Sequence, residues 1–286
     1  MRGNPTARAA GIVVLVVTAL LGSAYLLGRS LMPDQPQGQA TAIRTNAEAS
    51  YFADQPSTSA PTGPPSASSS PTEAGQDGSK RDAGDDKLFG AHSTTGTPRL
   101  ALTFDDGPDP RYTPQVLATL REFDVKATFC VVGENAQDHP DLIQAIVADG
   151  HTLCNHSWHH DITLGTRSTD TIRADLKRTN DAIHAAVPGA PIAWYRQPGG
   201  AWSYSVVSVA RQLGMTPLHW SVDPSDWQAP GARKITATVV SQVEPGSVVL
   251  MHDAGGDRQG TVDALRPILA DLTQRFELEA LPTEPT

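Results

Sequence analysis

The chain has 286 residues, a formal net charge of −9 at pH 7 and two cysteines. The acidic balance, without a stripe of lysine or arginine, argues against a nucleic-acid partner, and two cysteines are too few for a disulfide scaffold. The length is enough for one large or two small domains.

An uncharged apolar run, GIVVLVVTALLGSAYLLG at residues 11–28, dominates the first segment, residues 1–31. A run of this length is at the short end of what crosses a bilayer as a helix, and the arginines before it favour an N-terminus on the inner side. A cleaved signal peptide is the alternative, although GSA at 22–24 is a poor cleavage site. We expect a single-pass anchor in the cell membrane with the rest of the chain outside, or a secreted protein if the segment is cleaved.

Residues 32–96 are rich in Pro, Ser, Thr, Ala, Gly and Gln. A stretch such as PSTSAPTGPPSASSSPTEAG, residues 56–75, has too few apolar side chains to form a core. We therefore predict a disordered linker here.

Short apolar runs alternate with helical patterns over residues 97–286, which we assign to one catalytic domain. Strands are predicted over 99–104, 126–133, 151–155, 192–197, 216–222, 247–252 and 276–281. Helices are predicted over 113–123, 139–150, 168–187, 204–214, 233–243 and 261–274. This α/β alternation predicts a mostly parallel sheet with helices outside, as a small (β/α) barrel of about seven strands; a doubly wound open sheet is the alternative.

Charged and imidazole side chains follow five of these strands, where function is expected in a barrel. They are Asp105 and Asp106, His156 and His160, Arg196, Asp223 and Asp226, and His252 and Asp253.

Two adjacent aspartates cannot both ionise cheaply unless a cation lies beside them. His156 and His160 can supply neutral nitrogen ligands, and their i, i+4 spacing predicts one face of a helical turn. Two histidines and one carboxylate leave a coordination position open, as in catalytic zinc sites. His159, three residues after His156, is the alternative second ligand.

Five motifs resemble, in order, those of the polysaccharide deacetylases, the NodB-homology domains of carbohydrate esterase family 4. They are TFDDG (103–107), HSWHH (156–160), RQPGG (196–200), DPSDW (223–227) and LMH (250–252). The resemblance covers about residues 97–280 and implies a distorted, incomplete (β/α) barrel. TFDDG together with H-S-x-x-H is its most specific part, and it favours His160 over His159.

The resemblance also implies the role of each matching residue. Asp106, His156 and His160 would bind one divalent metal ion, Zn²⁺ first, with Co²⁺ or Mn²⁺ as alternatives. Asp105 would be the general base, oriented by Arg196 in a two-pronged contact. His252 would be the general acid, with its pKa raised by Asp226.

The substrate contacts implied by the resemblance are the backbone N–H of Gly199, as an oxyanion donor, and apolar walls made by Trp227 and Leu250. One position departs from the family pattern, because an aromatic residue usually stands where this chain has Gly199. The backbone donor survives that change, whereas a wall of the substrate groove is lost. Trp202 is a candidate to replace that wall.

The two cysteines, Cys130 and Cys154, lie on consecutive predicted strands. Neighbouring strands are close enough for a disulfide, and an exported domain permits one. Two buried thiols are the alternative.

We expect a metal-dependent enzyme that hydrolyses N-acetyl groups of N-acetylglucosamine residues in peptidoglycan or a chitin-like polymer. Its partners would be that polysaccharide and the membrane, with no nucleic acid, and the protein would be a monomer. An O-acetyl esterase of acetylated xylan and a non-catalytic wall-binding module are the alternatives. The anchor and the linker favour a cell-wall polymer.

Overall fold

The computed structural model describes residues 88–284. The anchor predicted at 1–31 and residues 32–87 of the predicted linker lie outside this range. The rest of the predicted linker, residues 88–96, packs on the domain instead: Ala91 is buried, and His92 and Thr94 form bridges with Leu218 and Ser247. The predicted end of the linker at residue 96 is therefore wrong. Within it, we find no helix that combines the length and the apolar character needed to cross a membrane.

Six parallel strands form one sheet in the described part of the chain, in the order β5-β4-β3-β2-β1-β6. They are β1 (Ala101–Asp105), β2 (Thr128–Val131), β3 (Thr152–Asn155), β4 (Trp194–Tyr195), β5 (Thr216–Pro217) and β6 (Val248–His252). The order is consecutive from β1 to β5, whereas a doubly wound sheet reverses direction at a switch point. The sheet is therefore that of a curled half-barrel, as predicted.

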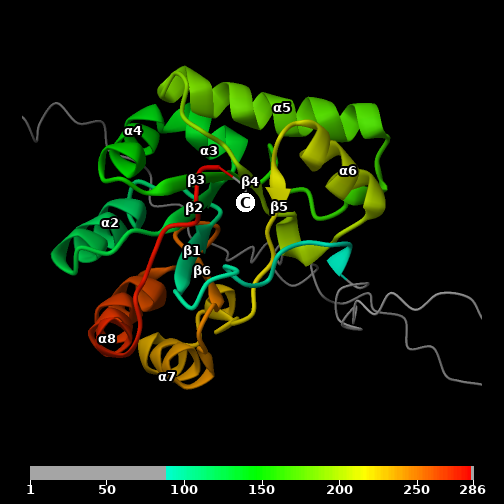
Figure 1. Cartoon of the computed structure of the whole chain (residues 1–286). Helices are drawn as coiled ribbons and strands as arrows, with labels where there is room; N and C mark the ends of the chain where they lie inside the picture. Colours follow the sequence, from blue (N-terminus) through cyan, green and yellow to red (C-terminus); the bar gives the residue numbers. More distant parts are fainter. Residues whose placement is uncertain (1–87, 285–286) are drawn as a thin grey trace, which may run out of the picture. The chain divides into compact units, whose positions relative to one another are not determined.

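Helices surround the strands on the outside (Figure 1). They are α2 (Thr113–Glu122), α3 (Gly133–Asp138), α4 (Pro140–Ala148), α5 (Thr169–Ala186), α6 (Tyr204–Gln212), α7 (Ala232–Gln242) and α8 (Gln259–Arg275). Single turns of 3₁₀ helix occur at η2 (Leu164–Thr166), η3 (Pro198–Gly200) and η4 (Asp226–Gln228). Helix α3 was not predicted, because six residues carry too little periodicity to be recognised.

Two of the predicted strands are wrong as drawn from the sequence. The run at 276–281 forms only an isolated bridge, between Leu278 and Leu100. The run at 216–222 divides, because its first two residues pair with β4 whereas Val222 bridges Val249 of β6. The second half of that run thus reaches the opposite edge of the sheet, and it brings the two ends of the curled sheet together.

Alternate residues of each strand point to opposite faces of the sheet. On β1, Leu102 and Phe104 join the apolar core beneath the helices, whereas Ala101 faces a second apolar cluster that also contains both cysteines. Cys130 and Cys154 are register partners on β2 and β3 and form a disulfide. This decides the alternative that the sequence left open.

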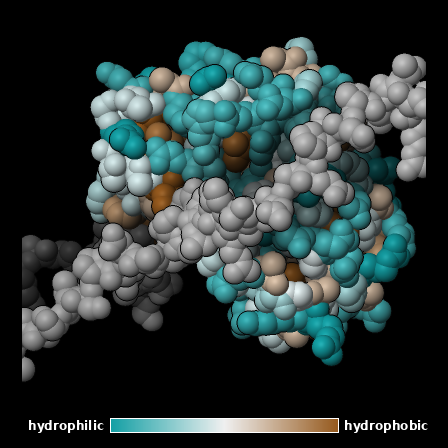
Figure 2. Space-filling view, turned by 180° about the vertical axis from the view of Figure 1, so that it is seen from behind, coloured by the Kyte–Doolittle hydropathy of each residue, from teal (hydrophilic) through white to brown (hydrophobic). Residues whose placement is uncertain are grey.

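Apolar side chains are mostly removed from water in the described residues. The view from behind is mainly hydrophilic, with apolar residues scattered singly (Figure 2). Among the large hydrophobic side chains of residues 88–284, Tyr204 is the exposed one, at 72%. Burial on both faces of a parallel sheet is what keeps its short strands in place.

Candidate active site

The two adjacent aspartates lie at the carboxyl end of β1. Asp105 is its last residue, and Asp106 follows with a left-handed backbone, φ 73°. The turn therefore begins at Asp106 itself, one residue before the Gly107-Pro108 pair. Because of this turn, both carboxylates face the same buried region instead of opposite faces of the strand.

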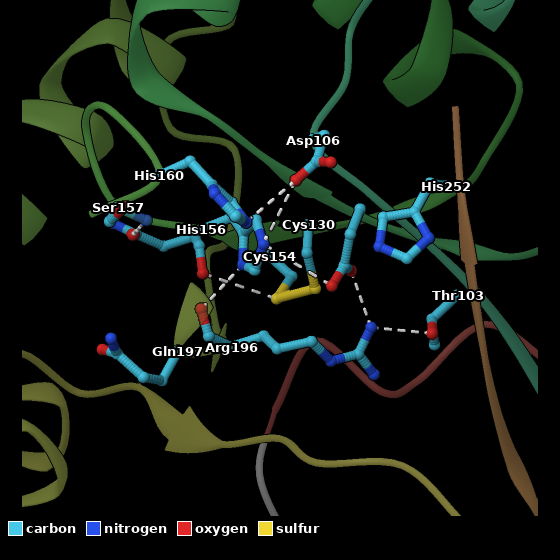
Figure 3. A network of polar contacts seen from close by, with 12 residues as sticks. Thr103, Asp106, Cys130, Cys154, His156, Ser157, His160, Arg196, Gln197 and His252 are labelled. Atoms are coloured by element: carbon cyan, nitrogen blue, oxygen red, sulfur yellow. Dashed lines mark hydrogen bonds and ion pairs between the residues drawn. A yellow bond between two sulfur atoms is a disulfide. The ribbon is translucent and has the colours of Figure 1, made fainter. Parts of the chain in front are cut away.

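Both histidines of the second motif converge on Asp106, as Figure 3 shows. Asp106 Oδ1 lies 3.5 Å from His156 Nε2 and 3.4 Å from His160 Nε2. The other ring nitrogen of His156, Nδ1, lies 2.8 Å from the carbonyl oxygen of Arg196 and must donate to it. This bond leaves the lone pair of Nε2 directed at the site.

The predicted helical turn between these histidines is wrong. Residues 156–160 form a loop in which Ser157 and His160 have left-handed backbones, with φ of 65° and 56°. The loop is tied down by Asn155, whose Oδ1 accepts the backbone N–H of Ser157 at 2.9 Å. These two left-handed residues bring the rings of His156 and His160 together, and the i, i+4 spacing in the sequence does not predict such a backbone.

The alternative ligand, His159, points elsewhere. Its Nδ1 pairs with the Glu134 carboxylate, and its side chain is 57% exposed. His160 is the histidine that faces Asp106, as the motif predicted.

The residues present fit a metal ion. Asp106 Oδ1 is buried and accepts no hydrogen bond, which is unfavourable for a carboxylate oxygen without a cation. One ligand atom from each of Asp106, His156 and His160 can be chosen so that all lie within 4.8 Å of one another. Burial lowers the pKa of His160, which favours the neutral ring that a metal requires. For Asp106, burial acts to raise the pKa, but the ring of His156 and the charge of His252 lower it below the ordinary range.

The orientation of Asp105 is set by Arg196, which is fully buried. Its NH1 donates to Asp105 Oδ1 at 2.7 Å and to the Thr103 hydroxyl at 2.8 Å. Its NH2 donates instead to the carbonyl of His219 at 3.0 Å. The two-pronged contact with Asp105 is thus wrong: one nitrogen holds the carboxylate, and the other fixes the guanidinium to the backbone.

His252 ends β6 beside Asp105, because the two are register partners on adjacent strands. Its Nδ1 lies 2.7 Å from Asp226 Oδ1. Burial acts to lower the pKa of His252, but the Asp226 carboxylate outweighs it and raises the pKa to about 9. In Figure 3, His252 stands across Asp106 from the other two histidines.

The second oxygen of Asp226 is also fully engaged. Asp226 Oδ2 accepts the backbone N–H of His252 at 2.8 Å and the hydroxyl of Thr261 at 2.7 Å. No motif in the sequence points to Thr261, because it lies 35 residues after Asp226, in α8.

The expected substrate contacts occupy three separate loops and strands. Leu250 is buried on β6 two residues before His252, and Trp227 is half-buried in η4 beside Asp226. Gly199 is exposed in η3 with φ 61°, and a side chain there would approach Ile162 to 3.2 Å. Trp202 is buried, and its ring N–H donates to His219 Nδ1 at 3.2 Å.

A further carboxylate, Asp253, lies beneath the first motif. Its Oδ2 accepts a hydrogen bond from the Thr113 hydroxyl at 2.5 Å, and a Cβ added at Gly107 would lie 2.4 Å from its Oδ1. Burial, together with the charges of Asp106 and Asp105, raises the pKa of Asp253 to about 7. The sequence placed Asp253 at the end of its strand but predicted no role for it.

Comparisons with known proteins show the family of this chain. Residues 92–218 match the family model described as polysaccharide deacetylase. A chitooligosaccharide deacetylase of Sinorhizobium fredii is 41% identical over 201 residues, which cover 66% of this chain and 93% of the relative. A peptidoglycan-N-acetylglucosamine deacetylase of Bacillus cereus is 37% identical over 178 residues, covering 62% of this chain and 82% of the relative.

Among solved structures, a peptidoglycan N-acetylglucosamine deacetylase in complex with 4-naphthalen-1-yl-N-oxidanyl-benzamide superposes with a TM-score of 0.63. It is 34% identical, and the match covers 66% of this chain and 89% of that one. By sequence, fold and site, the chain belongs to the polysaccharide deacetylase family and is a hydrolase of that family.

Proposed function

We propose that this protein removes acetyl groups from N-acetylglucosamine residues of an extracellular polymer, peptidoglycan first, and releases acetate. One observation carries this proposal: strand register places Asp105 beside His252, and each has its own buried partner. Amide hydrolysis requires a general base and a general acid close to the same bond. Here both lie at the same level of adjacent strands, next to three side chains that can bind a metal ion. The relatives named above support the substrate class, since one is a chitooligosaccharide deacetylase and another is a peptidoglycan-N-acetylglucosamine deacetylase.

One divalent ion, Zn²⁺ first and Co²⁺ or Mn²⁺ otherwise, would be held by Asp106, His156 and His160. When bound, it supplies Lewis-acid polarisation of the acetyl carbonyl and lowers the pKa of a coordinated water. Two imidazoles and one carboxylate form an established ligand set for catalytic zinc.

Asp105 is the residue proposed to take the proton of the attacking water. Arg196 occupies its Oδ1, which leaves Oδ2 as the free oxygen. That oxygen lies 3.6 Å from His156 Nε2, so it is next to the proposed metal position. Arg196 thus determines which oxygen acts as the base.

His252 is the residue proposed to protonate the departing amine. With a pKa of about 9, it is an imidazolium at neutral pH. Since Asp226 holds Nδ1, the proton on Nε2 is the one available to the leaving group. An amine leaves poorly unless it is protonated, so this proton is needed for amide more than for ester hydrolysis.

The remaining roles concern the acetyl group. The backbone N–H of Gly199 would donate to the developing oxyanion, and Trp227 and Leu250 would line the methyl group. Both side chains come from segments next to the Asp226–His252 pair.

We also propose that the domain works outside the cell, tethered by residues 1–31 and the linker at 32–87, and acts as a monomer. A flexible linker of about 56 residues spans roughly 40 Å on average, which reaches nearby wall polymer. The support is the apolar run and the composition of the linker.

Acetate release from three polymers tests the proposed function. The zinc-loaded full-length protein is incubated with chitooligosaccharide, peptidoglycan and acetylated xylan, with Asp105→Asn as the control. We expect acetate from the N-acetylglucosamine polymers and almost none from the variant. Acetate from xylan alone would indicate an O-acetyl esterase, and polymer binding without acetate from any of them would indicate a wall-binding module.

A further inference from the structure

Arg258 is a buried cation that the deacetylation chemistry described above does not use. It lies at the end of the loop that joins β6 to α8 and is 4% exposed. Its Nε donates to the carbonyl of Ala254 at 2.7 Å and its NH2 to that of Gly255 at 2.8 Å. Its NH1 donates to the carbonyls of Asp257 at 3.1 Å and Trp227 at 3.3 Å.

These four carbonyls belong to the two loops that carry the acid and its partner. Ala254 and Gly255 follow His252 in the chain, and Trp227 directly follows Asp226. One guanidinium therefore ties the loop after β6 to η4. The fork of five N–H groups on arginine is suited to several fixed acceptors, whereas lysine offers three donors from one point.

The loop that Arg258 holds also packs closely against Asp106, a proposed metal ligand. Gly255 has a left-handed backbone, φ 73°, and a Cβ added there would lie 2.2 Å from Asp106 Oδ2. The backbone of Gly255 therefore covers one oxygen of this carboxylate. The other oxygen, Oδ1, is the one that faces His156 and His160.

We propose that Arg258 is a positioning residue for the metal site: by fixing the loop at Gly255, it holds Asp106 so that Oδ1 points at the two histidines. This rests on the proposed function, because it assumes that these three residues bind the metal. It adds a residue that touches neither metal nor substrate and acts through the backbone of a neighbouring loop.

The test compares Arg258→Lys and Gly255→Ala with Arg266→Lys in the full-length protein. The first change keeps the charge and removes the fork, and the second keeps Arg258 but pushes on Asp106. Arg266 lies on the same helix, α8, in an exposed ion pair with Glu122, so it is a matched control. Zinc affinity is measured by calorimetry on metal-free protein, kcat and KM at saturating zinc, and the unfolding temperature by circular dichroism.

We expect both site variants to bind zinc about 10–100-fold more weakly than the parent protein, a typical effect of losing support for a ligand. We also expect kcat to fall more than KM rises, with Arg266→Lys unchanged in all three measurements. Variants that lose thermal stability but keep parental zinc affinity and kcat would overturn the inference, because Arg258 would then be a purely structural residue. If Arg258→Lys does not fold, Arg258→Gln, which keeps two N–H donors on an uncharged side chain, decides by the same criteria. A parent protein that binds no zinc would overturn the proposed function, and this inference with it.

Discussion

Two groups of carboxylate and imidazole lie side by side in this site, and they differ in how their oxygens are used. In the Asp226–His252 pair, both carboxylate oxygens are engaged, by the His252 ring, the His252 backbone and Thr261. In the group of Asp106, His156 and His160, the oxygen nearest both rings accepts no hydrogen bond.

The difference shows which carboxylate finds all its hydrogen-bond partners within the protein. Asp226 holds Nδ1 of His252 and keeps the ring protonated, so the ring can deliver its other proton, the one on Nε2. The buried Oδ1 of Asp106 accepts no hydrogen bond, while burial favours the neutral form of His160. A buried carboxylate oxygen that accepts no hydrogen bond is stabilised by a cation from outside the protein, and a neutral imidazole beside it can bind the same cation. The first group is thus suited to proton transfer and the second to holding a metal ion.

Replacing the base should give the largest effect and should separate catalysis from metal binding. We expect Asp105→Asn to lower kcat about 10²–10⁴-fold, the usual range for a general base. Zinc affinity should stay within a few-fold of the parent protein, because Asp105 is held by Arg196 and is not among the three ligands. Kinetics and calorimetry on the same preparation check this. Unchanged turnover would exclude Asp105 as the base.

Removing the acid should affect one substrate class more than the other. We expect His252→Ala to lower turnover of an N-acetyl substrate about 100-fold or more and that of an O-acetyl ester much less, because an alkoxide leaves more readily than an amide anion. Acetate release from matched amide and ester substrates measures the ratio. Equal losses on both would contradict the role of His252 as acid.

Removing the charge of Asp226 should shift the pH dependence. In the parent enzyme, activity should fall as pH rises through about 9, where the raised pKa of His252 leads to loss of the imidazolium. In Asp226→Asn we expect this limb to move down toward 6.5, the ordinary value for histidine. A kcat/KM profile from pH 5 to 10 detects the shift, and identical alkaline limbs would contradict the assignment.

The same raised pKa affects folding stability. A group whose pKa is raised in the folded state stabilises the fold fully below its unfolded value and loses that contribution as pH rises through the folded value. The His252 contribution should therefore be complete below about pH 6.5 and disappear through about pH 9. Chemical denaturation at both pH values should show this loss in the parent protein and much less of it in Asp226→Asn.

The smallest effect is expected at Thr261. Replacing it with Val removes one hydrogen bond to Asp226 and keeps the shape, which should lower the free energy of unfolding by about 1 kcal/mol. Zinc affinity should not change, since the hydroxyl of Thr261 donates to Asp226 and not to one of the three proposed metal ligands. A loss of zinc affinity in Thr261→Val would show that the two groups are not independent.

The sequence was most informative where chemistry is concentrated at strand ends. Asp105, Asp106 and His252 end strands that their apolar runs predict, and parallel strands bring such ends to one rim. The residues that support them were not predictable. Thr261 meets its partner across 35 residues, and Arg258 reaches Trp227 across 31, so neither belongs to a local pattern.

The errors in the predicted strands and turns have a related cause. The apolar run at 276–281 resembles a strand, but whether it pairs depends on a partner that local sequence does not specify. The helical turn predicted at 156–160 is wrong because i, i+4 spacing brings two side chains to one face only if the backbone is helical. Here Ser157 and His160 have left-handed backbones. Single-residue backbone conformations of this kind carry no periodic signal.

The most direct test is an anomalous-scattering map, recorded at the zinc edge, from crystals of the zinc-loaded protein. The account predicts one peak about 2.0–2.2 Å from Asp106 Oδ1, His156 Nε2 and His160 Nε2, with Asp105 still bonded to Arg196. A peak bound by other residues, or no peak among these three side chains, would contradict it.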